Sequence, residues 1–181
     1  MPSLSEAEAK EIVENINIQT FKKGSILLQE GEISKKCYSV LKGCVREYYI
    51  IDGEEKTTAF FTEGQEVVSF TSYTNQTPSK HYISCAEAST LTVSTPEKEK
   101  EMYKRFPKLE AITRTMMELN SGKSQEKLAS FITSSPEERY MNLLENRPDL
   151  LNRVPQHQIA SFLGIKPESL SRIRKRIVSK L

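Results

Sequence analysis

Four side chains near the C-terminal end of the chain have types and a spacing suited to reading a DNA sequence. Glu168, Ser171, Arg172 and Lys175 lie at relative positions 0, 3, 4 and 7, which places them along one face of a helix. In a major groove, arginine donates to guanine N7 and O6, and glutamate accepts from cytosine N4. We therefore predict that Glu168, Ser171 and Arg172 read base edges.

Glu168 is the unexpected member of this face. A lone carboxylate beside DNA phosphates is repelled by them, so a purely nonspecific DNA binder gains nothing from it. A base-reading role explains why a glutamate stands there. The alternative interpretation is structural: a glutamate in the first turn of a helix interacts favourably with the helix dipole.

Basic and polar residues around this face are suited to phosphate contacts, which position a protein on DNA without reading its sequence. Residues 150–181 hold seven basic residues and one acidic residue, a net charge of +6, whereas the remaining 19 basic and 23 acidic residues give −4. This asymmetry predicts a polyanion site, with a solvated basic helix face as the alternative. The predicted phosphate contacts are Gln156, His157, Lys166, Ser169, Arg174, Lys175 and Arg176. For His157, a buried or surface-only role is the alternative.

Residues 154–173 carry the signals of a helix-turn-helix that would present these side chains. Pro155 can open a first helix, whose apolar face is Ile159, Phe162 and Leu163. Gly164 suits the left-handed conformation that ends a helix. Pro167 then opens a second helix. The small Ala160 permits a close helix crossing, and the buried stripe of the second helix is predicted to be Leu170, Ile173 and Ile177.

The first half of the chain predicts an antiparallel sandwich or barrel. After a short helix capped by Ser5 and Glu8 and running to about Asn15, residues 18–94 show short apolar or aromatic runs separated by turn signals. Each turn places a glycine after a charged residue, at intervals of 7 to 12 residues. Glycine adopts the required turn conformations at low cost. The five turn glycines are Gly24, Gly31, Gly43, Gly53 and Gly64.

After Pro96 the pattern becomes helical. A charged helix is predicted over 97–105, a second helix begins at Pro107 and extends toward Phe131, and a third is capped by Ser135 and ends near Asn146. In the second helix, 3-4-3 apolar spacing is typical of a coiled-coil seam and predicts a dimerisation helix. The alternative is a helix packed on its own β domain. The seam residues are Leu109, Ile112, Met116 and Leu119.

Composition excludes several other classes. No apolar run reaches the length of a membrane span, and the polar start of the chain does not resemble a secretory signal, so we expect a cytoplasmic protein without membrane contact. Cys37, Cys44 and Cys85 lack metal-binding spacing and are expected to be neutral, packed thiols. With His81 as the sole histidine of the β region, a cupin-type metal site cannot form. We predict no metal, no cofactor and no enzymatic activity.

The whole layout resembles the Crp/Fnr family of bacterial transcription regulators. Residues 167–172 are similar to the core of the family's recognition helix, and Glu168, Ser171 and Arg172 match a Glu-x-x-Ser-Arg pattern. Members with that pattern use the glutamate and the arginine on a G·C pair of a palindromic half-site. The segments similar to the family's β-roll are Phe21-Lys22-Lys23-Gly24, Gly31, Leu41-Lys42-Gly43-Cys44-Val45-Arg46, Asp52-Gly53 and Phe60-Phe61-Thr62-Glu63-Gly64.

The resemblance implies an α+β architecture in three parts. Residues 1–106 are expected to form an antiparallel β-roll, a cupin-like double-stranded β-helix that acts as a sensor. Residues 107–133 are expected to form the dimerisation helix, and residues 134–181 an all-helical helix-turn-helix domain. The implied partners are double-stranded DNA, a second copy of the chain and RNA polymerase.

Two departures from the family pattern shape the expectations. The family's cyclic AMP cassette holds a Gly-Glu pair for the ribose and an Arg-Ser pair for the phosphate, where this chain has Val68-Ser69 and Ser79-Lys80. Serine lacks the carboxylate, and lysine lacks the bidentate fork of arginine, so cyclic AMP binding is predicted to be absent or very weak. The family's N-terminal cysteine cluster is also missing, and the effector stays unassigned.

The second departure is at the end of the chain, where Leu181 directly follows the recognition helix and leaves no residues for the family's β-hairpin wing. DNA contact is then expected to rest on the helices alone. The alternative function is a ligand-binding signalling module whose basic helical tail docks an acidic protein. Glu168 and Arg172 on one face fit base edges better than they fit an acidic protein surface.

Overall fold

A computed structural model describes residues 4–179, and the expectation about the wing after Leu181 lies outside these residues. The chain begins with helix α1 (Glu6–Glu14). Its predicted capping box is confirmed: the Glu8 amide donates to Ser5 Oγ, and the Glu8 carboxylate accepts from the Ser5 amide at 2.7 Å. Asn15 ends the helix, as expected.

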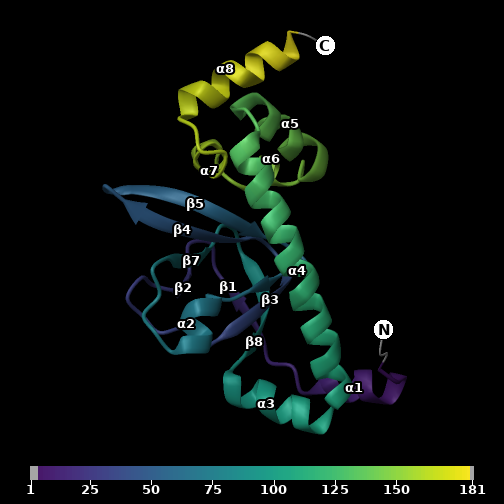
Figure 1. The fold of residues 1–181 in the computed structure, drawn as a ribbon. Coiled ribbons are helices and arrows are strands. Elements are labelled where there is room, and N and C mark those ends of the chain that lie inside the picture. Colours follow the sequence, from purple (N-terminus) through teal and green to yellow (C-terminus); the bar gives the residue numbers. More distant parts are fainter. Residues whose placement is uncertain (1–3, 180–181) are drawn as a thin grey trace.

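Two four-stranded antiparallel sheets form the β-roll, which confirms the predicted fold class (Figure 1). One sheet has the order β1-β8-β3-β6 and the other β2-β7-β4-β5. The buried side chains between the sheets include Val40, Val45, Val67, Ile83 and Leu91, each at most 2% exposed. The strands are β1 (Ile18–Phe21), β2 (Ile26–Leu28), β3 (Cys37–Lys42), β4 (Val45–Ile51), β5 (Glu54–Phe61), β6 (Glu66–Val67), β7 (Tyr82–Cys85) and β8 (Ser89–Ser94).

The turn prediction is confirmed at all five glycines, whose φ angles lie between +77° and +108°. Gly43 is the most constrained of them. A Cβ at this position would lie 2.6 Å from Ser89 Cα, so no larger residue fits between β3 and β4 without moving the backbone of β8. The local sequence therefore encodes the roll's turns through conformations that glycine tolerates.

The expectation of strands and turns throughout 18–94 is wrong for one segment, helix α2 (Phe70–Asn75). Its polar, β-branched sequence is a poor helix former. Tertiary contacts stabilise it: Ser72 is buried, its Oγ accepts from the Ser34 amide at 2.8 Å, and it donates to the Thr77 carbonyl at 2.6 Å. A partner on the β2–β3 loop therefore overrides local propensity.

The three cysteines are confirmed as free, packed thiols. Cys44 and Cys85 are buried and Cys37 is half-buried. Burial raises the pKa of Cys37 to about 12, with Glu99 and Glu66 adding to the shift, and burial likewise raises the pKa of Cys44 to about 12. At neutral pH these side chains behave as small apolar groups.

The helical half of the chain follows the predicted boundaries closely. Helix α3 (Pro96–Arg105) is capped by Thr95, and helix α4 (Pro107–Thr133) runs 27 residues without a break at Gly122. Helix α5 (Pro136–Asn146) has the predicted capping box, with Ser135 as its cap and Glu138 at the third position. The remaining helices are α6 (Leu150–Arg153), α7 (Gln156–Phe162) and α8 (Pro167–Val178).

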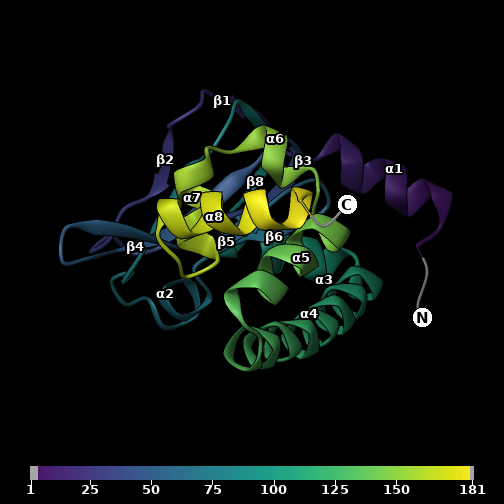
Figure 2. The same cartoon turned by 90° about the horizontal axis from the view of Figure 1, so that it is seen from above.

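The arrangement places α8 at the end of the molecule farthest from α3. Figure 1 shows α4 running along one side of the β-roll from α3 up to the C-terminal helices, with α7 between the β4–β5 hairpin and α8. Seen from above in Figure 2, α8 lies across this end as an outer layer. Within residues 4–179, no helix combines the length and the apolar composition that a membrane span requires.

Candidate nucleic-acid interface

Helices α7 and α8 form the predicted helix-turn-helix from local signals. Pro155 caps α7, Pro167 stands at the first position of α8, and Gly164 between them has φ +68°. The Ile165 amide donates to the Ala160 carbonyl at 3.0 Å, which fixes the turn. Ile159 and Ala160 are at most 1% exposed. The other predicted core residues Leu163, Leu170 and Ile173 are also buried, whereas Phe162 and Ile177 are partly buried.

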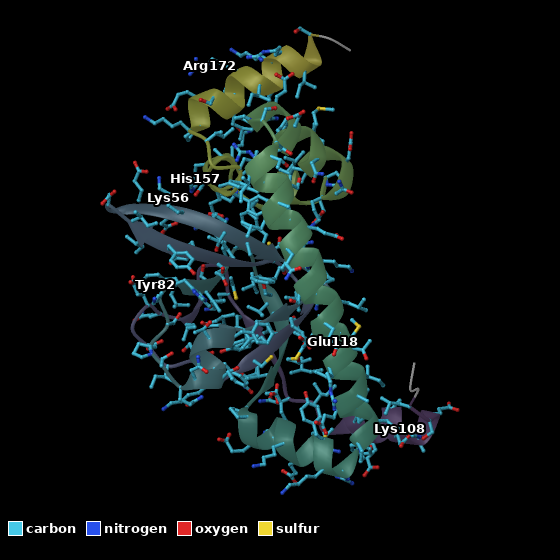
Figure 3. All side chains as sticks on the ribbon, in the orientation of Figure 1. Lys56, Tyr82, Lys108, Glu118, His157 and Arg172 are labelled. Carbon is cyan, nitrogen blue, oxygen red and sulfur yellow. The ribbon has the colours of Figure 1, made fainter. Side chains whose placement is uncertain are left out.

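The predicted base-reading face is exposed. Glu168, Ser171, Arg172 and Lys175 all lie on the surface of α8, opposite its buried stripe. The Arg172 Nε donates to the backbone carbonyl oxygen of Glu168, one helical turn earlier, at 3.4 Å. Among residues 4–179, no ion pair engages Glu168, Arg172 or Lys175. Figure 3 shows Arg172 projecting from α8 on the side away from the β-roll, while His157 lies lower, on α7.

A groove of about 430 Å³ runs between the start of α7 and the flank of α8. It brings together residues that lie 15 to 23 positions apart in the chain, and two of them are cationic. An open, polar and basic groove beside an exposed helix face can accept a phosphate backbone. The lining residues are Gln156, Ser171, Arg174, Lys175 and Ser179.

Some cations of the basic segment are paired with carboxylates of the same chain. Arg176 lies on the opposite flank of α8 and pairs with Glu137 of α5, with Nη1 and Oε2 2.7 Å apart. Arg153 is held by carboxylates of the β-roll. Lys166 is exposed and contributes to lowering the pKa of Glu54, whose main partner is Lys56. The net charge of +6 therefore overstates the free positive charge at this surface.

Arg153 fastens the C-terminal helices to the β-roll. Its two terminal nitrogens donate to both carboxylate oxygens of Glu63 at 2.9 and 2.8 Å, and its Nε donates to Glu87 at 2.9 Å. The side chain of Arg153 is 21% exposed, against 47% for Glu63 and 29% for Glu87. The Arg153 guanidinium lowers the pKa of Glu63 to about 2, against the cost of desolvation. We call these three residues the Arg153 clamp.

Helix α7 also covers the edge of a β-sheet. Strand β5 is an edge strand, and Ser161 of α7 satisfies two of its backbone groups: Oγ accepts from the Thr57 amide at 2.8 Å and donates to the Glu55 carbonyl at 2.9 Å. Phe60 and Phe162 pack edge to face, with ring centroids 5.4 Å apart. Since unpaired strand edges are otherwise open to association, this contact both protects β5 and orients α7.

The packing joins the two halves of the chain into one core. Cys44, Phe60 and Ala86 of the β-roll belong to the same buried cluster as Leu163 and Leu170. Phe131, near the end of α4, approaches the helix-turn-helix from the other side: a Cβ on Gly164 would lie 3.0 Å from its ring. The helix-turn-helix thus shares a buried core with the β-roll, and its turn lies close to the end of α4.

Sequence reasoning did not identify Arg153 or Ser161 as positioning residues. Arg153 was counted only as a basic residue, and its partners lie 66 and 90 positions away. Ser161 lies on the polar side of a short amphipathic helix, and its partners are 104 and 106 positions away. No local pattern distinguishes either residue from an ordinary solvated side chain.

The four positions aligned with the cyclic AMP cassette line neither the groove beside α8 nor the pocket at the β2–β3 loop. Val68, Ser69 and Ser79 are buried, whereas Lys80 is exposed. The Ser79 hydroxyl donates to the His81 carbonyl at 2.8 Å, and Ser69 precedes α2 without capping it. The side chains present thus hold local structure, and none supplies a carboxylate.

The four residues of the predicted seam on α4 differ in how far they are buried. Leu109 and Ile112 are half-buried, whereas Met116 and Leu119 are 47% and 49% exposed. The far end of the helix exposes further large apolar side chains, namely Leu128, Phe131 and Ile132. Contacts within one chain therefore partly cover the first half of the seam and leave its second half exposed to solvent.

Comparisons with known proteins agree with this architecture. Residues 18–106 match the family of the cyclic nucleotide-binding domain. No curated protein sequence gives a significant match. Among solved structures, FixK2 from Bradyrhizobium japonicum is 16% identical with a TM-score of 0.72, and the alignment covers 91% of this chain and 85% of that one.

Two further structures are similar over most of their length. A CooA mutant from Carboxydothermus hydrogenoformans is 18% identical, has a TM-score of 0.69, and is aligned over 94% of this chain and 79% of its own. The c-di-GMP responsive global regulator CLP from Xanthomonas campestris is 13% identical, with a TM-score of 0.67 and coverage of 97% and 93%. Residues 18–106 therefore resemble the cyclic nucleotide-binding domain, and the chain as a whole has the fold of the Crp/Fnr regulators.

Proposed function

We propose that this protein is a homodimeric regulator that binds double-stranded DNA in a sequence-specific manner. Residues 1–106 act as the sensor, residues 107–133 pair two chains, and residues 134–181 bind DNA. The two α8 helices enter successive major grooves about 34 Å apart on a palindromic site. Glu168, Ser171 and Arg172 read bases, while Lys166, Arg174 and Lys175 contact phosphates.

One observation carries this proposal: the exposed Glu168–Arg172 face lies beside a polar, basic groove at the outer end of the molecule. The buried stripe of α8 is on its opposite side, so the face meets DNA without rearranging the core. The carboxylate is the informative residue, because a basic surface for an acidic protein would gain nothing from Glu168. Gln156 at the start of α7 completes the groove and is suited to a phosphate oxygen.

The direct test is a selection of preferred duplexes from a random pool, followed by fluorescence anisotropy at several salt concentrations. We expect a palindrome to emerge, and the logarithm of affinity to fall linearly and steeply with the logarithm of salt, because phosphate-bound cations release counterions. Undetectable binding to every duplex would contradict the proposal and favour a protein partner for the basic helix.

Dimerisation is supported by helix α4. It is 27 residues long, about 40 Å at the usual rise per residue, and none of its side chains is fully buried. A helix of this length owes most of its stability to the packing of an apolar face. Met116 and Leu119, which lie on the predicted seam one turn apart, are 47% and 49% exposed in the single chain, so a second copy is the partner that fits this face.

The substitution Met116→Lys should shift the protein from dimer to monomer. A lysine at the centre of the seam would place a charge in an apolar contact without disturbing the chain's own core, since Met116 is 47% exposed. Sedimentation velocity measures the change. Glu118→Lys, on an exposed position two residues along the same helix, is the matched control and should remain dimeric. An unchanged dimer for Met116→Lys would place the interface elsewhere.

Cyclic AMP at micromolar concentration should neither raise the melting temperature nor release heat on titration. The ribose carboxylate is replaced by Ser69 and the phosphate guanidinium by Ser79, and the neighbouring exposed Lys80 offers only a single point charge. Calorimetry and thermal shift measure this, with a cyclic AMP-binding member of the family as the positive control. Micromolar affinity in either assay would contradict this prediction and show that other residues of the domain bind cyclic AMP.

A further inference from the structure

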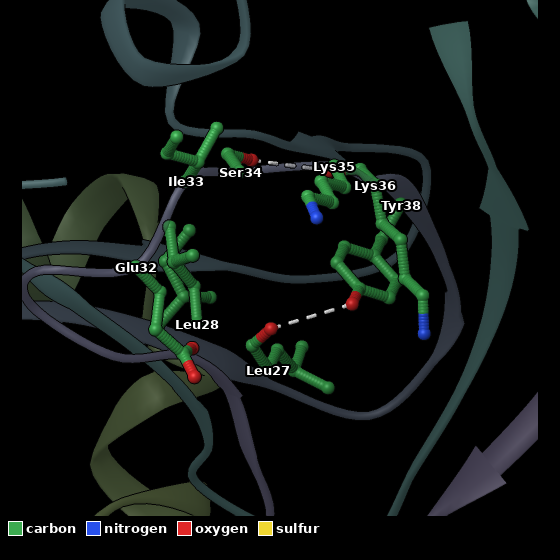
Figure 4. A pocket seen from close by; sticks show the side chains of 9 residues that line it. Leu27, Leu28, Glu32, Ile33, Ser34, Lys35, Lys36 and Tyr38 are labelled. Atoms are coloured by element: carbon green, nitrogen blue, oxygen red, sulfur yellow. Dashed lines mark hydrogen bonds between the residues drawn. The ribbon is translucent and has the colours of Figure 1, made fainter. Parts of the chain in front are cut away.

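A pocket of about 420 Å³ opens at the β2–β3 loop, away from the DNA-binding helices (Figure 4). Its volume falls in the range of small-molecule sites, about 300–1,000 Å³. None of the four positions aligned with the cyclic AMP cassette lines this pocket. The lining residues are Leu27, Leu28, Glu32, Ile33, Ser34, Lys35, Lys36, Tyr38 and Ile83.

The floor of this pocket is apolar. Leu28, Tyr38 and Ile83 are 5%, 5% and 2% exposed, and they belong to the core of the β-roll. The Tyr38 hydroxyl donates to the Leu27 carbonyl at 3.4 Å, and burial raises its pKa to about 12. The floor therefore carries no charge at neutral pH and suits the hydrocarbon part of a ligand.

The rim is cationic on one side. Lys35 and Lys36 are exposed, and among residues 4–179 neither ammonium group has an ion-pair partner. Figure 4 shows the lysine pair on the same side of the opening as Ser34 and Tyr38, across from Leu28 and Glu32. On the other side, the Glu32 carboxylate accepts from the Gln29 amide at 3.0 Å. The lysine side of the rim thus offers two unpaired positive charges above an apolar floor.

The loop that forms the rim is joined to the cassette segment. The Gly31 amide donates to the Ser79 carbonyl, and the Ser79 amide donates to the Glu32 carbonyl, both at 2.8 Å. Ile33 forms a bridge with Pro78, and the Ser34 amide donates to Ser72 of α2 at 2.8 Å. A ligand that shifts residues 31–36 would therefore also move α2 and the segment around Ser79.

We propose that this pocket binds an amphipathic carboxylate, such as a medium-chain fatty acid. The hydrocarbon chain lies against Leu28, Tyr38 and Ile83, and the carboxylate lies at Lys35 and Lys36. The two lysines favour a ligand with a negatively charged head group. The apolar floor favours a ligand with a hydrocarbon tail, which a free inorganic ion lacks. Because binding here does not involve DNA, it can be tested whether or not the proposed DNA-binding function holds.

The test is calorimetric titration of the full chain with decanoate, below the concentration at which it forms micelles. The double substitution Lys35→Glu with Lys36→Glu should weaken decanoate binding about tenfold or more. The matched control is Lys22→Glu with Lys23→Glu, another pair of adjacent exposed lysines in the same domain but outside the pocket, and it should bind like the unaltered protein. Equal losses in both double variants would mean a general charge effect and overturn the proposal.

Two further measurements separate the head group from the tail. Decyltrimethylammonium, which has the same tail and the opposite charge, should bind at least about tenfold more weakly than decanoate, and inorganic phosphate should bind more weakly still. Ile33→Trp adds bulk at the mouth and should reduce decanoate binding, while circular dichroism checks that the fold is kept. No heat with decanoate, or binding of phosphate as tight as that of decanoate, would contradict the site.

Discussion

Arg172→Ala is expected to weaken binding to the selected palindrome by roughly 1–3 kcal/mol, or roughly 5- to 150-fold in Kd. Arg172 is exposed on the free face of α8, so its removal leaves the core intact and would delete the bidentate contact with guanine that we propose. Selectivity should relax at a single base pair. Anisotropy titrations with the palindrome and with duplexes altered at one position at a time measure both effects.

Lys175→Ala is the matched control for this prediction. Lys175 lies on the same helix and lines the groove between α7 and α8, so its loss should weaken all duplexes alike and reduce the salt slope by about one. Glu168→Ala should relax selectivity at the same base pair as Arg172→Ala. If Arg172→Ala weakens random DNA as much as the palindrome, the arginine contacts phosphate and the base-reading assignment is wrong.

Arg153→Ala is expected to lower the free energy of unfolding by about 1–2 kcal/mol and to loosen α7 from β5. The side chain is only 21% exposed and makes hydrogen bonds to two carboxylates, which would be left close together without a counter-charge. The half-exposed Glu63 can regain water, which keeps the effect moderate. Urea denaturation measures the stability, and hydrogen exchange at the Thr57 amide reports whether Ser161 still covers the strand edge.

The control for the clamp is Arg114→Ala. Arg114 pairs with Glu110 one turn away on α4, and both side chains are more than half exposed, so the loss should be below about 0.5 kcal/mol. If both arginine variants change stability by similarly small amounts and the Thr57 amide stays equally protected, the apolar core alone positions the C-terminal helices.

The clamp also predicts how the interface responds to acid. The pKa of Glu63 is about 2 in the folded protein, against 4.5 for an unperturbed glutamate. Because the folded pKa is lowered, its contribution to stability is complete above about pH 4.5 and is lost as the pH falls toward 2. Docking of α7 should therefore persist through mildly acidic conditions, and exchange at Thr57 as a function of pH tests this.

The exposed face of α8 and the buried face of α7 were predictable from the sequence. Pro155, Gly164 and Pro167 place the helix boundaries through local backbone preferences, and apolar spacing decides which side is buried. The same holds for the caps at Ser5 and Ser135 and for the turn glycines. Each of these signals acts over a few residues, so no knowledge of distant contacts is required.

The presence of helix α2 and the pairing of the basic side chains could be seen only in the tertiary structure. Ser72 stabilises α2 through Ser34, which is 38 positions away, so its local sequence misled the prediction. Arg176 belongs by composition to the basic surface, yet it pairs with Glu137, which is 39 positions away. Counting charges along the chain cannot separate cations that face solvent from cations that hold the fold together.

By itself, the sequence determined the β-roll, the long helix, the helix-turn-helix and the face that carries Glu168 and Arg172. The tertiary structure alone decided how that face is held: Arg153 and Ser161 of the C-terminal helices contact Glu63, Glu87 and the edge of β5 across 66 to 106 positions of the chain. Periodicity and capping are local properties of the backbone. A salt bridge or a covered strand edge exists only once the packing of a shared core has brought its partners together.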